Sequence, residues 1–78
     1  MIYNIELNNG TGGFCCHFEH NGHKYFAAVH VVSLGGGTEC MIYPEDTLDK
    51  MYGKWNVPVT PEGLTACIEE FVRMKEAI

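Results

Sequence analysis

The sequence predicts an α+β domain: a four-stranded antiparallel β-meander with two C-terminal helices packed on one face. Two observations lead to this prediction. The first two thirds of the chain alternate apolar and polar residues between glycine-rich turns, and the last third repeats apolar residues at helical spacing. A chain of 78 residues has room for a single domain, which we place at 1–78.

The predicted strands are separated by residues that favour turns. Asn21-Gly22 between two strand-like segments is a strong hairpin signal, because both turn positions need a positive φ. Three glycines then precede the last strand, and Pro44 ends it. The four strands are expected at about 1–8, 13–20, 23–34 and 38–43.

The Asn21-Gly22 turn also predicts the register of the hairpin. The expected pairs are His20 with His23, Glu19 with Lys24, Phe18 with Tyr25, His17 with Phe26, and Cys16 with Ala27. The Glu19–Lys24 pair indicates that its side of the sheet faces solvent. The opposite side, which carries Phe18 and Tyr25, is therefore the predicted core face.

Two helices are expected at about 46–54 and 61–77. The first is predicted from apolar residues at helical spacing after Asp46 or Thr47 as a cap, although Gly53 weakens its end. The second begins with Thr60 as N-cap and Pro61 at the first helical position. The core is expected to contain Tyr3, Ile5, Leu7, Phe14, Phe18, Tyr25, Val29, Leu48, Trp55, Leu64 and Phe71.

Composition argues against several functional classes. The net charge is -5 and the five Lys and Arg residues are scattered, so direct nucleic-acid binding is not expected. No segment has the ~18 consecutive apolar residues of a membrane span, and the N-terminus does not resemble a signal peptide. We therefore expect a cytoplasmic protein with four free thiols, of which Cys16, Cys40 and Cys67 are small core residues.

No catalytic residues and no cofactor are predicted. Cys15 and His17 lie on one face, but a nucleophile pair would need a third orienting group and a pocket. The glycine-rich loops lack the Gly-Lys-Ser/Thr ending of a phosphate loop. His20 and His23 could hold one metal ion across the turn, and this stays as a less favoured alternative because two ligands do not close a site.

The solvent-facing side of the sheet should be polar, but its far end is apolar. It is expected to carry Phe26, Ala28, His30 and Val32, with Cys40 and Ile42 beside them. Such a patch usually marks an interaction surface, unless the glycine turn shifts the register and buries part of it. The predicted partner-binding residues are His17, Glu19, Lys24, Phe26 and His30, with Phe26 as anchor.

The segment 18–29, the turn that follows, Pro44 to Thr47, Trp55 and Gly63-Leu64 resemble a phage-encoded type I-F anti-CRISPR protein of similar length. The resemblance implies four antiparallel strands with two helices on one side. It also implies binding to the crRNA-binding backbone subunits of a CRISPR surveillance complex through the open sheet face. That family uses a tyrosine before the hairpin and a glutamate on the third strand, where this chain has Glu19 and His30.

We therefore expect a small non-enzymatic domain that binds a protein partner, in the manner of a phage inhibitor of a host defence complex. The alternative is a homodimeric structural domain that uses the same face, or its edge strands, to bind a second copy.

Overall fold

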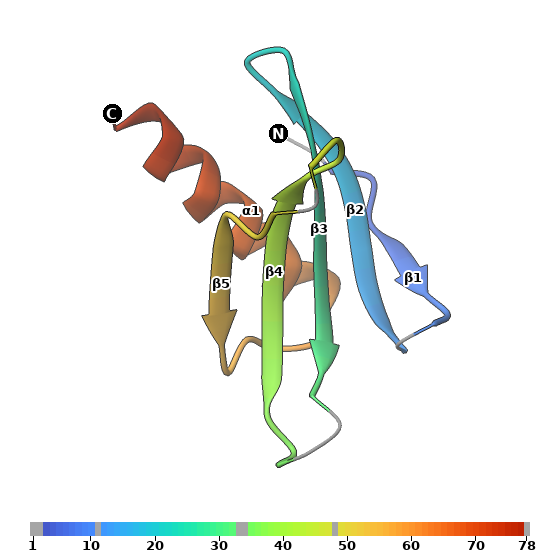
Figure 1. Cartoon of the computed structure of the whole chain (residues 1–78). Helices are drawn as coiled ribbons and strands as arrows, with labels where there is room; N and C mark the ends of the chain where they lie inside the picture. The colour runs from blue at the N-terminus through green and yellow to red at the C-terminus, as the bar shows by residue number, and fades with distance from the viewer. Residues whose placement is uncertain (1–2, 11, 33–34, 48, 78) are drawn as a thin grey trace.

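The computed structural model describes residues 3–10, 12–32, 35–47 and 49–77. Within these ranges, five strands form one antiparallel sheet and one helix lies across a single face of it (Figure 1). The elements are β1 (Glu6–Asn8), β2 (Gly13–His20), β3 (His23–Val31), β4 (Thr38–Pro44), β5 (Tyr52–Trp55) and α1 (Pro61–Glu76). The order of the strands in the sheet is their order in the chain.

The predicted α+β class is confirmed, but the prediction of four strands and two helices is wrong. The helix expected at 46–54 is replaced by a turn and by β5, which pairs with β4 through Ile42–Tyr52 and Glu39–Trp55. A glycine costs about 1 kcal/mol in a helix, so Gly53 disfavours the helix that the apolar spacing suggested. In β5, the absence of a side chain at Gly53 leaves room for Lys50 to pass over the strand.

The other predicted boundaries need smaller corrections. The β2–β3 hairpin has the predicted register, and both Asn21 (φ 52°) and Gly22 (φ 79°) adopt positive φ. The first strand covers only Glu6–Asn8, and β3 ends at Val31 rather than at residue 34. Residues 1–2 and 33–34 lie outside the described residues.

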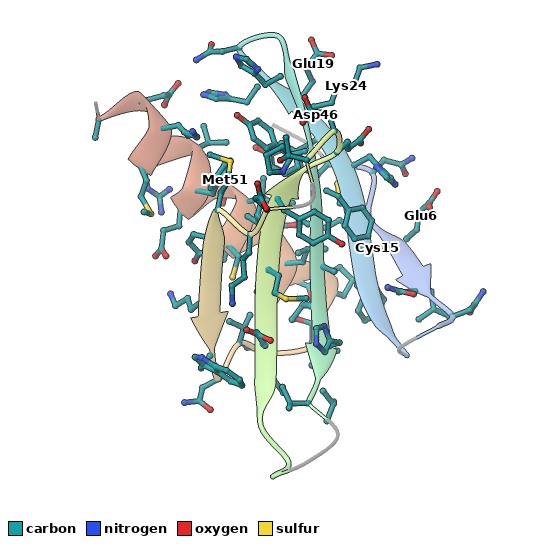
Figure 2. All side chains as sticks on the ribbon, in the orientation of Figure 1. Glu6, Cys15, Glu19, Lys24, Asp46 and Met51 are labelled. Carbon is teal, nitrogen blue, oxygen red and sulfur yellow. The ribbon has the colours of Figure 1, made fainter. Side chains whose placement is uncertain are left out.

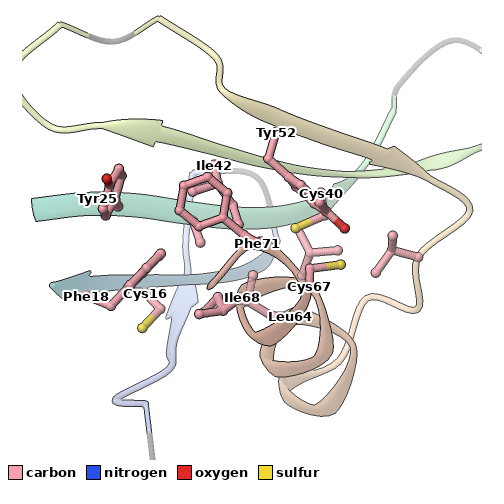
Figure 3. Packing of buried hydrophobic residues seen from close by; sticks show 13 residues of the cluster. Cys16, Phe18, Tyr25, Cys40, Ile42, Tyr52, Leu64, Cys67, Ile68 and Phe71 are labelled. Atoms are coloured by element: carbon pink, nitrogen blue, oxygen red, sulfur yellow. The ribbon is translucent and has the colours of Figure 1, made fainter. Parts of the chain in front are cut away.

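The core lies between α1 and the strand face that carries Phe18 and Tyr25 (Figure 3). It consists of Cys16, Phe18, Tyr25, Ala27, Val29, Cys40, Ile42, Tyr52, Val57, Leu64, Cys67, Ile68 and Phe71. This confirms five of the predicted core residues and the burial of Cys16, Cys40 and Cys67.

The other predicted core positions have different outcomes. Tyr3, Ile5 and Phe14 are only partly buried against the core. Leu7 is 59% exposed because it lies on an edge strand, and Trp55 is 60% exposed because β5 turns it away from α1. Both predictions of burial are therefore wrong. Leu48 lies outside the described residues.

The N-terminus of α1 forms as predicted. The Thr60 hydroxyl accepts a hydrogen bond from the backbone N–H of Gly63 at 3.0 Å, and Pro61 occupies the first turn. Phe71 then reaches the centre of the aromatic core, where its ring meets those of Tyr25 at 5.1 Å and Phe18 at 6.1 Å between centroids. The cap therefore starts the helix in a position that lets its apolar stripe cover the sheet.

A polar contact joins α1 to the edge of the sheet. The Tyr52 hydroxyl donates to Glu70 Oε1 at 2.6 Å, and Lys54 Nζ lies 3.4 Å from Glu70 Oε2. Burial, and then the Glu70 carboxylate, raise the pKa of Tyr52 above its ordinary value. The hydrogen bond from Tyr52, and then that from Lys54, lower the pKa of Glu70.

We expect this contact to make stability depend on pH. The pKa of Glu70 is lower in the folded state than its ordinary value of 4.5. The stability that the ionised Glu70 carboxylate contributes is therefore present above pH 4.5, and it is lost as the pH falls through the folded-state pKa. Urea unfolding should therefore show less loss of stability between about pH 6 and about pH 3 in Tyr52→Phe than in the unmodified protein. An equal loss of folding stability at acid pH in the two proteins would contradict a role for the Tyr52–Glu70 hydrogen bond.

Candidate functional site

The face of the sheet opposite α1, called the open face below, carries all five predicted partner-binding residues. Side chains alternate along a strand, so residues next to core positions point to this face. Its members on β2 to β5 are Cys15, His17, Glu19, Lys24, Phe26, Ala28, His30, Glu39, Met41, Tyr43, Gly53 and Trp55. Figure 2 looks onto this face, with Glu19 and Lys24 at its hairpin end and Cys15 farther along β2.

An aromatic row crosses the centre of the open face from β2 to β4. His17 pairs with Phe26, and Phe26 pairs with Tyr43. The ring centroids are 4.8 Å apart for His17 and Phe26 and 5.5 Å apart for Phe26 and Tyr43. These contacts hold Phe26 between two rings, so it is half-buried although α1, the helix of the described residues, lies on the other face.

The next row toward the far end of the sheet has no aromatic side chain. It runs through Cys15, Ala28, Met41 and Gly53. Ala28 is only 5% exposed, because the larger side chains around it screen its methyl group. Beyond this row, Trp55 on β5 is largely exposed, so the open face combines a flat apolar centre with an accessible indole.

Charged side chains border the apolar centre. Glu45, in the turn after β4, accepts a hydrogen bond from His17 Nδ1 at 2.6 Å. On the other side, Lys50 Nζ lies 3.5 Å from Glu39 Oε2. Glu19 and Lys24 are directly opposite each other on β2 and β3. This arrangement of an aromatic centre inside a polar border is typical of a protein-binding surface.

The prediction that Cys40 and Ile42 lie on the open face is wrong. Cys40 pairs with Val29 and Ile42 pairs with Ala27, which places both on the core side with no exposed surface. The same register brings Met41 and Tyr43, which the sequence analysis missed, to the open face. The sequence predicts that side chains of β4 alternate between the two faces. The glycine-rich residues at 32–37 do not reveal which alternate set faces the core. Val32, just after β3, is half-buried.

The titratable groups do not assemble into a metal centre among the described residues. No group of three or more His, Cys, Asp or Glu side chains is placed to hold an ion in these ranges. His20 and His23 pair across the hairpin, and His20 Nε2 lies 3.3 Å from Asn21 Nδ2. Burial raises the pKa of the Cys16 and Cys40 thiols, which keeps them in the weakly reactive thiol form.

In the described part of the chain, no helix is both long enough and apolar enough to span a bilayer. No protein-family model matches the sequence, and comparisons with curated proteins and with solved structures find no significant match.

Proposed function

We propose that this chain is a small, non-enzymatic protein-binding domain that captures a partner protein on its open face. The observation that carries the proposal is the aromatic row of His17, Phe26 and Tyr43 on a sheet face that α1 does not cover. Aromatic side chains bury a large area and often dominate the energy of an interface. Phe26 is the proposed anchor, and His17, Glu19, Lys24 and His30 are proposed to surround it at the contact.

The charge of the domain favours a basic partner. The chain carries ten Asp and Glu residues against five Lys and Arg, and Glu19, Glu45 and Asp46 stand at the hairpin end of the open face. Complementary charge steers association and disfavours partners of like charge. Proteins that bind nucleic acid through its phosphates carry such basic surfaces.

The proposed partner class is therefore a nucleic-acid-binding protein, and the resemblance to type I-F anti-CRISPR proteins suggests a specific one. We propose that the domain acts in the cytoplasm as a phage-type inhibitor that binds the crRNA-binding backbone subunits of a surveillance complex. Inhibition of this kind needs no cofactor and no direct contact with nucleic acid, because the inhibitor occupies the surface on which the target DNA would pair.

The test is binding of the purified domain to an immobilised type I-F surveillance complex, together with binding of target DNA by that complex. Phe26→Asp is expected to weaken capture by about 100-fold or more, because it removes a central aromatic anchor and places a charge there. The substitution should cost about 1 kcal/mol of stability, since Phe26 is not in the core. A folded Phe26→Asp domain that binds normally would place the interaction elsewhere.

Met74→Asp provides the matched control. Met74 is 54% exposed on α1, and α1 packs on the other side of the sheet. This variant introduces the same charge at an exposed apolar position away from the open face, so it should bind the complex as the unmodified domain does. Equal losses in both variants would indicate a general effect of charge rather than an anchor at Phe26.

The second candidate function is a homodimer through the same face, and the exposed indole of Trp55 favours it. Light scattering at micromolar concentration separates the two candidates. A monomer that binds the complex supports the inhibitor, and a dimer that Phe26→Asp dissociates supports the homodimer.

A further inference from the structure

Two of the free thiols meet in the core, where α1 packs on the sheet. Cys40 lies on the core side of β4, Cys67 lies on the buried face of α1, and both are almost fully buried. Figure 3 shows the two side chains beside each other in the core. We propose that Cys40 and Cys67 are a redox-active pair, which a peroxide converts into a reversible disulfide bond between the sheet and the helix.

The contacts around the two thiols bring them together. Cys40 pairs with Lys54 across β4 and β5, and Lys54 Nζ lies 3.4 Å from Oε2 of Glu70, three residues after Cys67 on α1. The Tyr52 hydroxyl donates to the other oxygen of this carboxylate at 2.6 Å. These contacts hold one turn of α1 over β4 and β5, which places Cys67 against Cys40. In agreement, burial and then the neighbouring Cys67 thiol raise the pKa of Cys40.

A cavity gives small molecules a path to one of the two thiols. It has a volume of about 490 Å³ and lies between β5, the segment 56–60 and α1. Cys67 lines this cavity, whereas Cys40 has no exposed surface. A peroxide molecule that enters the cavity therefore meets Cys67 first, and Cys40 lies behind it as the thiol that completes the disulfide.

The reaction has two steps, and hydrogen peroxide is the two-electron oxidant. The Cys67 sulfur gives up its proton and attacks one peroxide oxygen; the O–O bond breaks, one water leaves, and Cys67 becomes a sulfenic acid. The Cys40 sulfur then attacks the Cys67 sulfur, the S–O bond breaks, and the leaving hydroxide takes the Cys40 proton as a second water. The two sulfur atoms together lose the two electrons that the peroxide gains.

The burial of Cys40 favours this order of events. Its raised pKa keeps it in the thiol form, which reacts slowly with dissolved oxidants. Contact with Cys67 replaces that slow encounter with a reaction between neighbours in the same molecule, which is far more effective. A thiol reductant can reverse the product by exchange, so a reducing compartment is compatible with a transient disulfide. The proposal does not depend on the protein-binding function, because both thiols lie on the side of the sheet away from the open face.

The test is mass spectrometry of the folded full chain after treatment with one equivalent of hydrogen peroxide and blocking of the remaining thiols. We expect the intact mass before blocking to fall by two hydrogen atoms, and dithiothreitol to restore it. The oxidised protein should also unfold at a higher urea concentration than the reduced protein, because the bond closes a loop in the unfolded chain. A gain of oxygen atoms without this loss of hydrogen would overturn the proposal.

Tryptic peptides identify the bond. Cleavage after Lys and Arg places Cys40 in peptide 25–50, Cys67 in peptide 55–73, and the other two cysteines in peptide 1–24. The pair 25–50 with 55–73 should be at least about tenfold more abundant than any pair that contains 1–24, because the folded state holds its thiols together. Oxidation in urea should remove this preference. Equal amounts of all pairs from the folded chain, or oxidation confined to 1–24, would contradict the proposal.

Variants test the order of the two steps. In Cys40→Ala, Cys67 should stop at the sulfenic acid, which dimedone labels, whereas in Cys67→Ala the Cys40 thiol should stay unlabelled. Cys15→Ser is the matched control, since Cys15 is a half-buried thiol on the open face, and it should form the Cys40–Cys67 bond as the unmodified chain does. Equal labelling of Cys40 and Cys67 in the two alanine variants would contradict the order. If either variant does not fold, the peptide map of the unmodified chain still decides whether the bond forms.

Discussion

Replacing Phe71 with alanine is expected to destabilise the domain by about 3–5 kcal/mol, because it leaves a cavity at the centre of the aromatic core. The Phe71 ring meets those of Phe18, Tyr25 and Tyr52, so three neighbours from three strands lose a contact at once. The total stability of a domain of 78 residues is roughly 4–12 kcal/mol. A loss of this size should therefore leave much of the protein unfolded or close to unfolding.

Urea unfolding followed by circular dichroism measures this effect. Met74→Ala on the same helix should cost less than about 0.5 kcal/mol, because that side chain is largely exposed. If Phe71→Ala does not fold, Phe71→Leu keeps most of the volume and should cost about 1.5 kcal/mol. An unchanged urea midpoint in both Phe71 variants would mean that α1 packs through a different face.

Replacing Gly63 with alanine is expected to destabilise the domain by about 2 kcal/mol or more, although the same change usually stabilises a helix. A Cβ atom at Gly63 would lie 2.2 Å from the carbonyl oxygen of Pro58, which is backbone and cannot move aside. That oxygen also accepts the backbone N–H of Thr60, the N-cap of α1. Relieving the clash therefore disturbs the connection that starts the helix.

Gly53→Ala is the matched control for Gly63→Ala. A Cβ atom at Gly53 would meet only the flexible end of the Lys50 side chain, at 3.4 Å from Nζ. Since alanine restricts the unfolded chain, this variant should be neutral or more stable by about 0.5 kcal/mol. Thermal unfolding of both variants distinguishes the two sites, and equal midpoints would show that the helix start tolerates a side chain at Gly63.

The parts of the fold that the sequence predicted well are those that a local signal determines. A two-residue turn leaves a single register for its strands, so the partners of His17 and Glu19 followed directly from Asn21-Gly22. Likewise, Thr60 and Pro61 mark a helix start that does not depend on the rest of the protein. The same register placed all five predicted partner-binding residues on the open face.

The parts that the sequence did not predict depend on contacts between distant residues. Segment 52–55 is four residues long, too short for alternation to be distinguished from helical spacing, and it becomes a strand because the edge of β4 pairs with it. The choice of which β4 side chains face the core similarly depends on a glycine-rich connection whose turn type the sequence does not specify. Tyr43 was missed and Cys40 was misplaced for that reason.

The sheet order has a consequence for how the chain folds. Because every strand pairs with its neighbour in the sequence, each pairing closes a short loop and costs little chain entropy. The meander can therefore assemble progressively from the N-terminus while the chain is being synthesised. Among the described residues, α1 supplies most of the cover on the apolar side of that sheet, and it follows all five strands in the chain. Until α1 has emerged from the ribosome, the nascent sheet exposes its apolar side, so this is the interval in which a chaperone is most needed.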